Sequence, residues 1–452
     1  METNTQTPKA KFGLFTTISM IAGIVIGSGI FFKTDDVLYA TDGNVLMGVL
    51  LWSVGAIGII FGGLCISRYA MKNDTVGGLI TYCEDAWGKR FGYMAGWFQT
   101  VFYYPALIAI LCWISGMYIG LIFNITDPFS LPVWLMTITI LIVFFLLNVL
   151  ATAKAGAFQN ITLVLKISAL LILTLIGLCF GQAANLSASA APAAMKTGLF
   201  TGLIACAFSF DGWFIAPSIA HEIRDPKKNL SKALVIVPLL ILTIYLAYFI
   251  GINYLLGPAQ IMQLGDSSVG YIASSLVGGI GSKIVYCAVS LSVLGTVNGI
   301  VLGYIRLPYA LALRREIIGY RALARLDQTR DIPLNSALLC FILSSLWLLL
   351  HFFSSLKLKL GFLDFSSLSI DSIPIVLTYL FYASLYLKLI LDGRRDPAHR
   401  SWRYHLLYPL LALAGAILVL IGGLQGSGWI YLVISVIGIL AGILVRPKQP
   451  SE

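Results

Sequence analysis

Two glycines and a serine interrupt an apolar segment that is long enough to cross a membrane. The interruption reads GIVIGSGIF over residues 23–31, and the apolar run around it extends roughly from residue 13 to residue 33. Glycine costs about 1 kcal/mol relative to alanine inside a helix, and hydrocarbon offers no partner to peptide groups freed by unwinding. We therefore expect a broken helix whose free peptide groups bind a polar ligand.

The ligand expected at such a break has an acidic end and a basic end. The N–H groups of Ser28, Gly29 and Ile30 would begin a second half-helix and present a partial positive charge to a carboxylate. The carbonyls that end the first half-helix would accept from an ammonium. Close helix packing by small residues is the alternative, but a glycine, a serine and a glycine in succession at 27–29 favour the break.

A second interruption is predicted five spans later, where ACAFSFDGW occupies residues 205–213. A charged Asp at the bilayer centre costs about 2.5 to 3.5 kcal/mol on insertion scales, so Asp211 should face a cavity, a partner or an unwound backbone. An aromatic packing face with a satisfied acid is the alternative, and a structural role for Asp211 is as well supported as a functional one.

Composition sets the class of protein that must hold these breaks. The chain is 58% hydrophobic and 11% charged, with a mean hydropathy of +0.90, which indicates an integral membrane protein. Apolar runs of spanning length recur about twelve times. Their expected positions are 13–38, 43–67, 92–123, 131–150, 158–181, 197–219, 232–256, 270–306, 334–353, 369–391, 404–422 and 427–445.

Lys and Arg crowd every second connection between these runs, as in the loops near residues 68–90, 224–232, 314–330 and 394–403. This is the positive-inside asymmetry, and with an even number of spans it predicts that both termini are cytoplasmic. The net charge of +10 thus encodes orientation rather than a nucleic-acid partner. The sequence has no phosphate loop, metal cluster or nucleophile–base arrangement, so we expect neither an enzyme nor a cofactor.

Two interrupted helices at matching places in two five-helix blocks are typical of an inverted-repeat transporter. The predicted organisation is an N-terminal tail over 1–12, a first repeat over 13–181, a second repeat over 197–391, two further helices over 404–445 and a tail over 446–452.

Taken together, the motifs resemble the amino acid/polyamine/organocation superfamily, in its L-type amino acid transporter branch with the bacterial serine/threonine exchangers. The motifs that carry the resemblance are GIVIGSGIF at 23–31, GG at 77–78 with Tyr82, GWFQ at 96–99 with Tyr103 and Pro105, FSFDGW at 208–213, HEIRDPKKNL at 221–230, and GTVNG at 295–299 followed by Arg306. Departures from the family pattern are Arg68, Tyr104, which either narrows the pocket or faces lipid, and the pair His221-Glu222.

The resemblance implies an all-α fold of five-plus-five inverted repeats, with helices 1 and 6 broken mid-membrane and two C-terminal helices added. It also implies a substrate site around Gly27, with the N–H groups of residues 28–30 on the substrate carboxylate and carbonyls near Ile24 and Val25 on its ammonium. The Phe208 carbonyl would bind the ammonium as well, and its ring would close over the substrate as an outer gate. Ser209 and Phe210 are expected to contact the substrate.

Lys166 lies well inside the fifth span, too deep to reach the interface easily, so we expect it to be buried against a partner. The resemblance places it where sodium-coupled relatives of the same fold hold a cation. Asn298 is expected to hydrogen-bond across helices. Arg306 either pairs with a gate acid such as Glu222 or is a solvated cation at a helix end.

The function implied is sodium-independent transport of neutral L-amino acids by exchange, with small substrates such as serine, threonine or alanine favoured. Proton-coupled symport on the same fold is one alternative, and a membrane receptor that binds an amino acid without moving it is another. We expect the cell membrane as the location. The loop at 124–130 has no cysteine, so a disulfide-linked heavy subunit is not expected.

Overall fold

A computed structural model gives the fold. It describes residues 13–27, 29–72, 78–150, 152–187, 199–214, 217, 220, 223–327, 332–356, 359–360, 363–364, 370, 372–395, 401–424 and 428–446.

Long helices make up most of the described chain. They are α1 (Leu14–Val25), α4 (Val45–Lys72), α6 (Lys89–Phe98), α7 (Tyr104–Ile122), α8 (Leu131–Leu150), α9 (Thr152–Phe180), α11 (Leu199–Ser209), α12 (Pro226–Leu256), α14 (Ser268–Val277), α15 (Gly279–Tyr304), α18 (Leu334–Ser355), α19 (Ser372–Arg395), α20 (Tyr408–Leu424) and α21 (Gly428–Val445).

Short elements join or extend these helices. They are α2 (Gly29–Phe32), α3 (Thr34–Ala40), α5 (Leu79–Trp87), α10 (Ala183–Ser187), α13 (Pro258–Leu264), α16 (Arg306–Leu313), α17 (Tyr320–Leu323), the π-helices η1 (Gln99–Tyr103) and η6 (Arg403–Leu407), the 3₁₀ helix η3 (Gly265–Ser267), and the antiparallel strands β1 (Lys359–Leu360) and β2 (Leu363–Asp364).

Ten helical stretches within the described residues are long and apolar enough to cross a membrane, so the chain is a multi-pass membrane protein. Two of the expected spans are not among the ten. The run predicted at 197–219 contains α11, which is only 11 residues long. The run at 427–445 contains α21, whose 18 residues are long enough for a span, so its length does not exclude it.

The expected span at 270–306 is wrong at its start. Gly278 ends α14 with a φ of 75°, a left-handed conformation that glycine adopts without strain, and α15 begins at the next residue. Hydropathy is continuous across this turn, so the apolar pattern alone joins two helices that the backbone separates.

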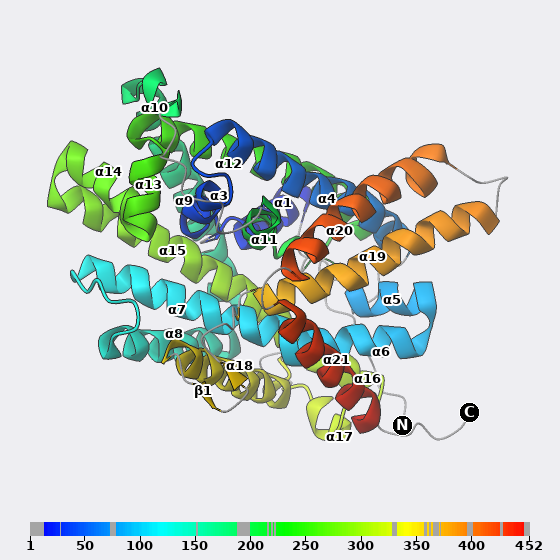
Figure 1. The fold of residues 1–452 in the computed structure, drawn as a ribbon. Helices are drawn as coiled ribbons and strands as arrows, with labels where there is room; N and C mark the ends of the chain where they lie inside the picture. Colours follow the sequence, from blue (N-terminus) through cyan, green and yellow to red (C-terminus); the bar gives the residue numbers. More distant parts are fainter. Residues whose placement is uncertain are drawn as a thin grey trace.

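The two interrupted helices occupy the centre of the bundle. Figure 1 shows α1 and α11 between a layer that contains α4 and α12 and a layer that contains α7 and α15. Contacts agree with this view, because α1 packs against α9, α12 and α15, while α11 packs against α4 and α20. The sequence predicts that the substrate binds at these two interruptions, so the predicted substrate site lies at the centre of the bundle.

The third span, Lys89–Ile122, contains the π-helix η1 between α6 and α7. The wider turn leaves backbone carbonyls available to other helices: the Tyr304 hydroxyl donates to the Thr100 carbonyl at 2.6 Å, and the Trp347 indole donates to the Val101 carbonyl at 2.7 Å. On α6, the Trp97 indole donates to the Gly438 carbonyl of α21 at 3.0 Å. Three other helices thus hold this span in place.

Candidate functional site

The first interruption separates α1 from α2. Helix α1 ends at Val25, and Ile26 has a ψ of 85°, outside the helical range. The Gly27 N–H donates to the Val25 carbonyl at 2.8 Å rather than to the Gly23 carbonyl four residues back. Helix α2 begins at Gly29, whereas Ser28 lies outside the described residues. The Gly23 carbonyl therefore loses its helical donor.

Side chains from α9 and α15 bind two of the freed carbonyls. The ammonium of the fully buried Lys166, on α9, lies 2.6 Å from the Gly23 carbonyl and 3.4 Å from the Thr296 hydroxyl. The Ser292 hydroxyl of α15 donates to the Gly27 carbonyl at 3.3 Å. Buried peptide groups need such partners because water does not reach them.

The second interruption ends α11 at Ser209 and is closed mainly by its own backbone. The Phe210 N–H donates to the Cys206 carbonyl at 3.0 Å, and the Asp211 N–H donates to the Phe208 carbonyl at 3.2 Å. Gly212 then turns the chain with a φ of 94°. The Phe208 carbonyl, predicted to bind the substrate ammonium, thus already accepts one hydrogen bond and has a second lone pair available.

The two interruptions touch each other. A Cβ added to Gly29 would lie 2.4 Å from the Ser209 Cα, so only glycine permits this approach of two backbones. The hydroxyl of the buried Tyr245, on α12, lies 3.2 Å from the Val25 carbonyl and 3.0 Å from the Ser209 carbonyl. One side chain therefore bridges a freed carbonyl in each broken helix.

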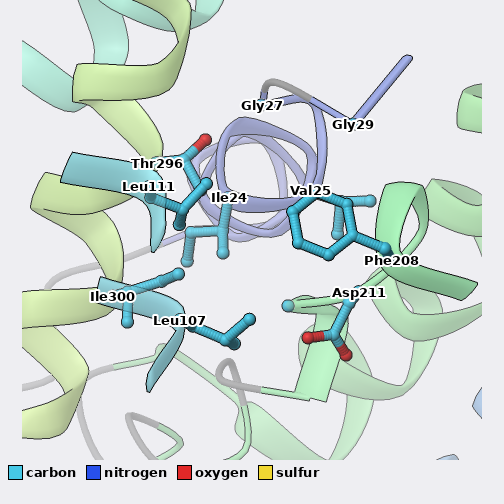
Figure 2. Close-up of a pocket in the computed structure, with 11 residues that line it drawn as sticks. Ile24, Val25, Gly27, Gly29, Leu107, Leu111, Phe208, Asp211, Thr296 and Ile300 are labelled. Atoms are coloured by element: carbon cyan, nitrogen blue, oxygen red, sulfur yellow. The ribbon is translucent and has the colours of Figure 1, made fainter. Parts of the chain in front are cut away.

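A cavity with about 330 Å³ of empty space, part of it open, lies beside this junction. Figure 2 shows the Phe208 ring and Asp211 on one side of it and apolar side chains of α7 and α15 on the other. Its lining is Ile24, Val25, Gly27, Gly29, Leu107, Leu111, Phe208, Asp211, Gly212, Thr296 and Ile300. The cavity is mostly apolar, with backbone and few polar side chains at its edges, which is the usual character of a small-molecule site.

Two side chains close parts of this cavity. Phe208 is only 8% exposed, and its ring covers the cavity beside Val25 (Figure 2). Asp211 accepts a hydrogen bond of 2.7 Å from the Tyr103 hydroxyl, which comes from η1. A carboxylate that lines the cavity is thus fixed by a donor from the third span.

Three predicted contact residues lie outside the cavity lining. Ile30 is completely buried and belongs to the core. The Ser209 hydroxyl donates back to the Ala205 carbonyl at 2.8 Å, as serine commonly does in helices. The Phe210 ring packs against Trp52 and Tyr245, with centroid distances of 5.7 and 5.3 Å. Carboxylate binding by the Ile30 N–H and substrate contact by Ser209 and Phe210 stay predictions.

The remaining predicted residues lie in helix packing or outside the described chain. The Asn148 amide donates to Asn298 at 3.1 Å, across helices α8 and α15. The Arg306 guanidinium donates to the Leu302 carbonyl at 2.8 Å, and Glu222, its predicted partner, lies outside the described residues.

Two of the departures from the family pattern, Arg68 and Tyr104, have packing roles, and the pair at 221–222 lies outside the described residues. The Arg68 guanidinium lies 4.7 Å from the centroid of the Tyr404 ring. Tyr104 is 3% exposed and stacks on Tyr304, with a centroid distance of 5.5 Å, so of its two alternatives the one that faces lipid is wrong.

Sequence reasoning missed three residues of the site: Tyr245, Ser292 and Thr296. A tyrosine in an apolar helix and a hydroxyl residue in a transmembrane helix have ordinary packing roles, so neither has a distinctive pattern. The one available signal for Thr296 is its place in the GTVNG motif at 295–299. No group of three or more His, Cys, Asp or Glu side chains in the described part of the chain is placed to hold a metal ion.

Known proteins resemble the chain over nearly its whole length. A family model described as amino acid permease matches residues 12–446. The serine/threonine exchanger SteT of Bacillus subtilis is 26% identical over 423 residues, which are 93% of this chain and 92% of that protein. Human large neutral amino acids transporter small subunit 2 is 25% identical, over 90% of this chain and 74% of that protein. Mouse b(0,+)-type amino acid transporter 1 is 24% identical, over 98% and 88%.

Proposed function

The chain belongs to the amino acid permease family, and from that premise we propose that it exchanges small neutral L-amino acids by alternating access without sodium. The observation that carries this proposal is the meeting of two interrupted helices beside one cavity, with the Gly29 and Ser209 backbones in contact. In this proposal, the N–H groups that begin α2 and the carbonyls that end α1 and α11 match the two ends of a zwitterion.

In the proposed site, the start of α2 binds the substrate carboxylate through the N–H groups of Ser28, Gly29 and Ile30. The carbonyls of Ile24, Val25 and Phe208 receive the ammonium. The apolar wall of α7 and α15 selects the side chain, and its small space favours serine, threonine or alanine. The serine/threonine exchange named for the bacterial relative supports this choice of substrate.

The absence of sodium coupling is proposed from Lys166. Its ammonium already lies on the Gly23 carbonyl and near Thr296, so a positive charge is present beside the first interruption without a bound ion. A fixed cation and a second cation at the same carbonyls would repel each other. Exchange then needs no ion gradient.

The same proposal includes the finer architecture. Spans one to five and six to ten form two inverted repeats, over 13–181 and 197–391, followed by two more helices over 404–445. Twelve spans in the cell membrane place both tails, 1–12 and 446–452, in the cytoplasm. They place α3 and α13 at the outer face of the membrane. The protein acts without a disulfide-linked heavy subunit; isolation of such a heterodimer would contradict this.

Purified protein in proteoliposomes tests the function. Radioactive serine should enter vesicles loaded with serine, threonine or alanine, and enter empty vesicles much more slowly, in sodium and choline buffers alike. If uptake into empty vesicles equals uptake into loaded vesicles and follows a pH gradient, the mechanism is proton-coupled symport rather than exchange. Binding of serine without any flux would indicate a receptor. Competition by a panel of amino acids then defines the side chains that the wall accepts.

A further inference from the structure

Lys33 lies at the joint between α2 and α3, next to the ring that covers the cavity. Its ammonium nitrogen is 5.4 Å from the centroid of the Phe208 ring and 4.7 Å from that of Phe32. The Lys33 side chain is only 13% exposed. Attraction between a cation and an aromatic face grows as water is removed, so this contact is more stabilising than one at an open surface.

Asp36 holds this ammonium in position. Its carboxylate oxygen lies 3.0 Å from the Lys33 nitrogen, three residues further along the chain in α3. The Asp36 side chain is 49% exposed, so the pair alone contributes little to stability. Its effect is to orient the lysine over the two rings.

The contact extends to the opposite wall of the bundle. The Phe32 ring meets Trp113 of α7 edge to face, with a centroid distance of 6.3 Å. The Trp113 indole in turn donates to the Pro128 carbonyl at 3.0 Å. Lys33 therefore lies between the ring of an interrupted helix and an aromatic surface that is anchored on α7.

We propose that Lys33 is a positioning residue that fastens the Phe208 ring over the cavity and so slows release of substrate toward the α3 side. This inference rests on the function proposed above and on the role of outer gate that the family resemblance implies for the Phe208 ring. The lysine acts through the ring and does not touch the substrate. Its loss should loosen one face of the transporter and leave the other unchanged.

The experiment measures serine exchange in proteoliposomes whose orientation is established by protease accessibility. The half-saturating concentration is determined on each face in turn, with saturating serine on the other. Lys33→Met keeps the length of the side chain and removes the charge. We expect it to raise half-saturation on the α3 side by about two- to thirtyfold, the range of a partly desolvated cation–π contact. The opposite face should be unchanged, and Lys33→Arg should restore the wild-type value.

Lys283→Met is the matched control, since it removes an exposed positive charge at the start of α15. An equal change on both faces in Lys33→Met would overturn the inference, as would the same change in Lys283→Met or no restoration by arginine. If the wild-type protein exchanges serine and Lys33→Met has the same half-saturating concentrations on both faces, Lys33 has no role in the gate and the proposed function still stands. If the wild-type protein exchanges no amino acid, the proposed function itself fails.

Discussion

The two interruptions solve the same backbone problem in different ways. At the first, side chains from three other helices, Lys166, Tyr245 and Ser292, bind carbonyls of residues 23, 25 and 27. At the second, the chain turns back on itself, and its N–H groups at 210 and 211 bind carbonyls of its own last helical turn. The Tyr245 hydroxyl contacts a carbonyl of each interruption, those of Val25 and Ser209.

The difference indicates which interruption is fixed and which can move. The first is tied to α9, α12 and α15, so displacing it breaks several buried hydrogen bonds at once. The second is closed by two backbone hydrogen bonds of its own and is tied to other helices through Tyr245 and through the bond between Tyr103 and Asp211, so fewer bonds resist its movement with the Phe208 ring. We infer that the first interruption is the platform for the substrate and the second carries the lid.

Substitution at the contact between the two interruptions should have the largest effect. In Gly29→Ala the new Cβ would lie 2.4 Å from the Ser209 Cα, and neither atom belongs to a flexible side-chain end. Overpacking of this kind costs about 1 to 3 kcal/mol, so exchange should fall by up to roughly a hundredfold. Initial rates of serine exchange in proteoliposomes measure this.

Gly13→Ala is the control for that substitution, because a Cβ there meets no atom within 4 Å. It should exchange serine at the wild-type rate. Wild-type activity in Gly29→Ala would show that the two backbones need not approach so closely, and the comparison between the interruptions would lose its basis.

Removal of the Lys166 charge tests whether the first interruption is the fixed one. Lys166→Met leaves the Gly23 carbonyl without its ammonium, and a buried hydrogen bond to a charged group contributes about 1.5 to 3 kcal/mol. Exchange should fall roughly thirtyfold while membrane insertion is retained, as measured by flux per amount of reconstituted protein. Lys89→Met removes an exposed lysine and should be neutral. Undiminished flux in Lys166→Met would contradict the fixed platform.

The shared hydroxyl of Tyr245 sharpens the comparison further. A phenol has one proton to share between the Val25 and Ser209 carbonyls, so Tyr245→Phe removes about one hydrogen bond, or 0.5 to 1.5 kcal/mol. Exchange should fall by about two- to tenfold. Tyr248→Phe, one turn further along α12 and equally buried, should change it less. If the two variants behave alike, the hydroxyl bridge has no special role.

The smallest expected effect concerns pH at the α3 side. Loss of hydration and the neighbouring Asp36 raise the pKa of Asp35 to about 6, and loss of hydration and Asp35 raise the pKa of Asp266 to about 7. Charged or titratable groups that act on these two carboxyls or lie near them are Lys33, Asp36, Tyr118 and Tyr286.

Raised pKa values mean that the packed arrangement of α3 and η3 binds protons more tightly than an open, hydrated one. Proton binding therefore stabilises the packed arrangement relative to the open one. This stabilisation is fully present below the ordinary carboxyl pKa of 3.8 and is lost as pH rises through about 6 to 7. Exchange from the α3 side should therefore slow by about twofold between pH 8 and pH 5.5, with pH equal on both sides. Asp266→Asn should remove most of this dependence; an unaltered pH profile in that variant would contradict it.

Much of the fold follows from hydropathy and glycine placement. Apolar runs predicted the multi-pass membrane protein, and the GIVIGSGIF and FSFDGW motifs predicted the permease family; the structure and the family match confirm both. Where hydropathy is continuous, the apolar pattern does not reveal where one helix ends and the next begins. At Gly278, for example, a left-handed glycine divides an uninterrupted apolar stretch into two helices.

The site was less accessible to sequence reasoning because its hydrogen bonds join residues far apart in the chain. The depth of Lys166 in its apolar run indicates a buried partner, but that the partner is Gly23 depends on the packing of α9 against α1. Tyr245 carries no local signal at all, since aromatic residues in membrane helices usually only pack. Only the crossing of α12 with both broken helices gives its hydroxyl two acceptors.

The π-helix in the third span allows this span to contact α21 with one face and the cavity with another. One additional residue in a turn rotates everything after it by about 100° relative to a regular α-helix. The face of α6 that carries Trp97 toward α21 is therefore out of phase with the face of α7 that carries Leu107 and Leu111 toward the cavity. Deleting one residue within 99–103 would restore a regular helix and turn the cavity wall away from the substrate, even though every side chain of that wall would still be present.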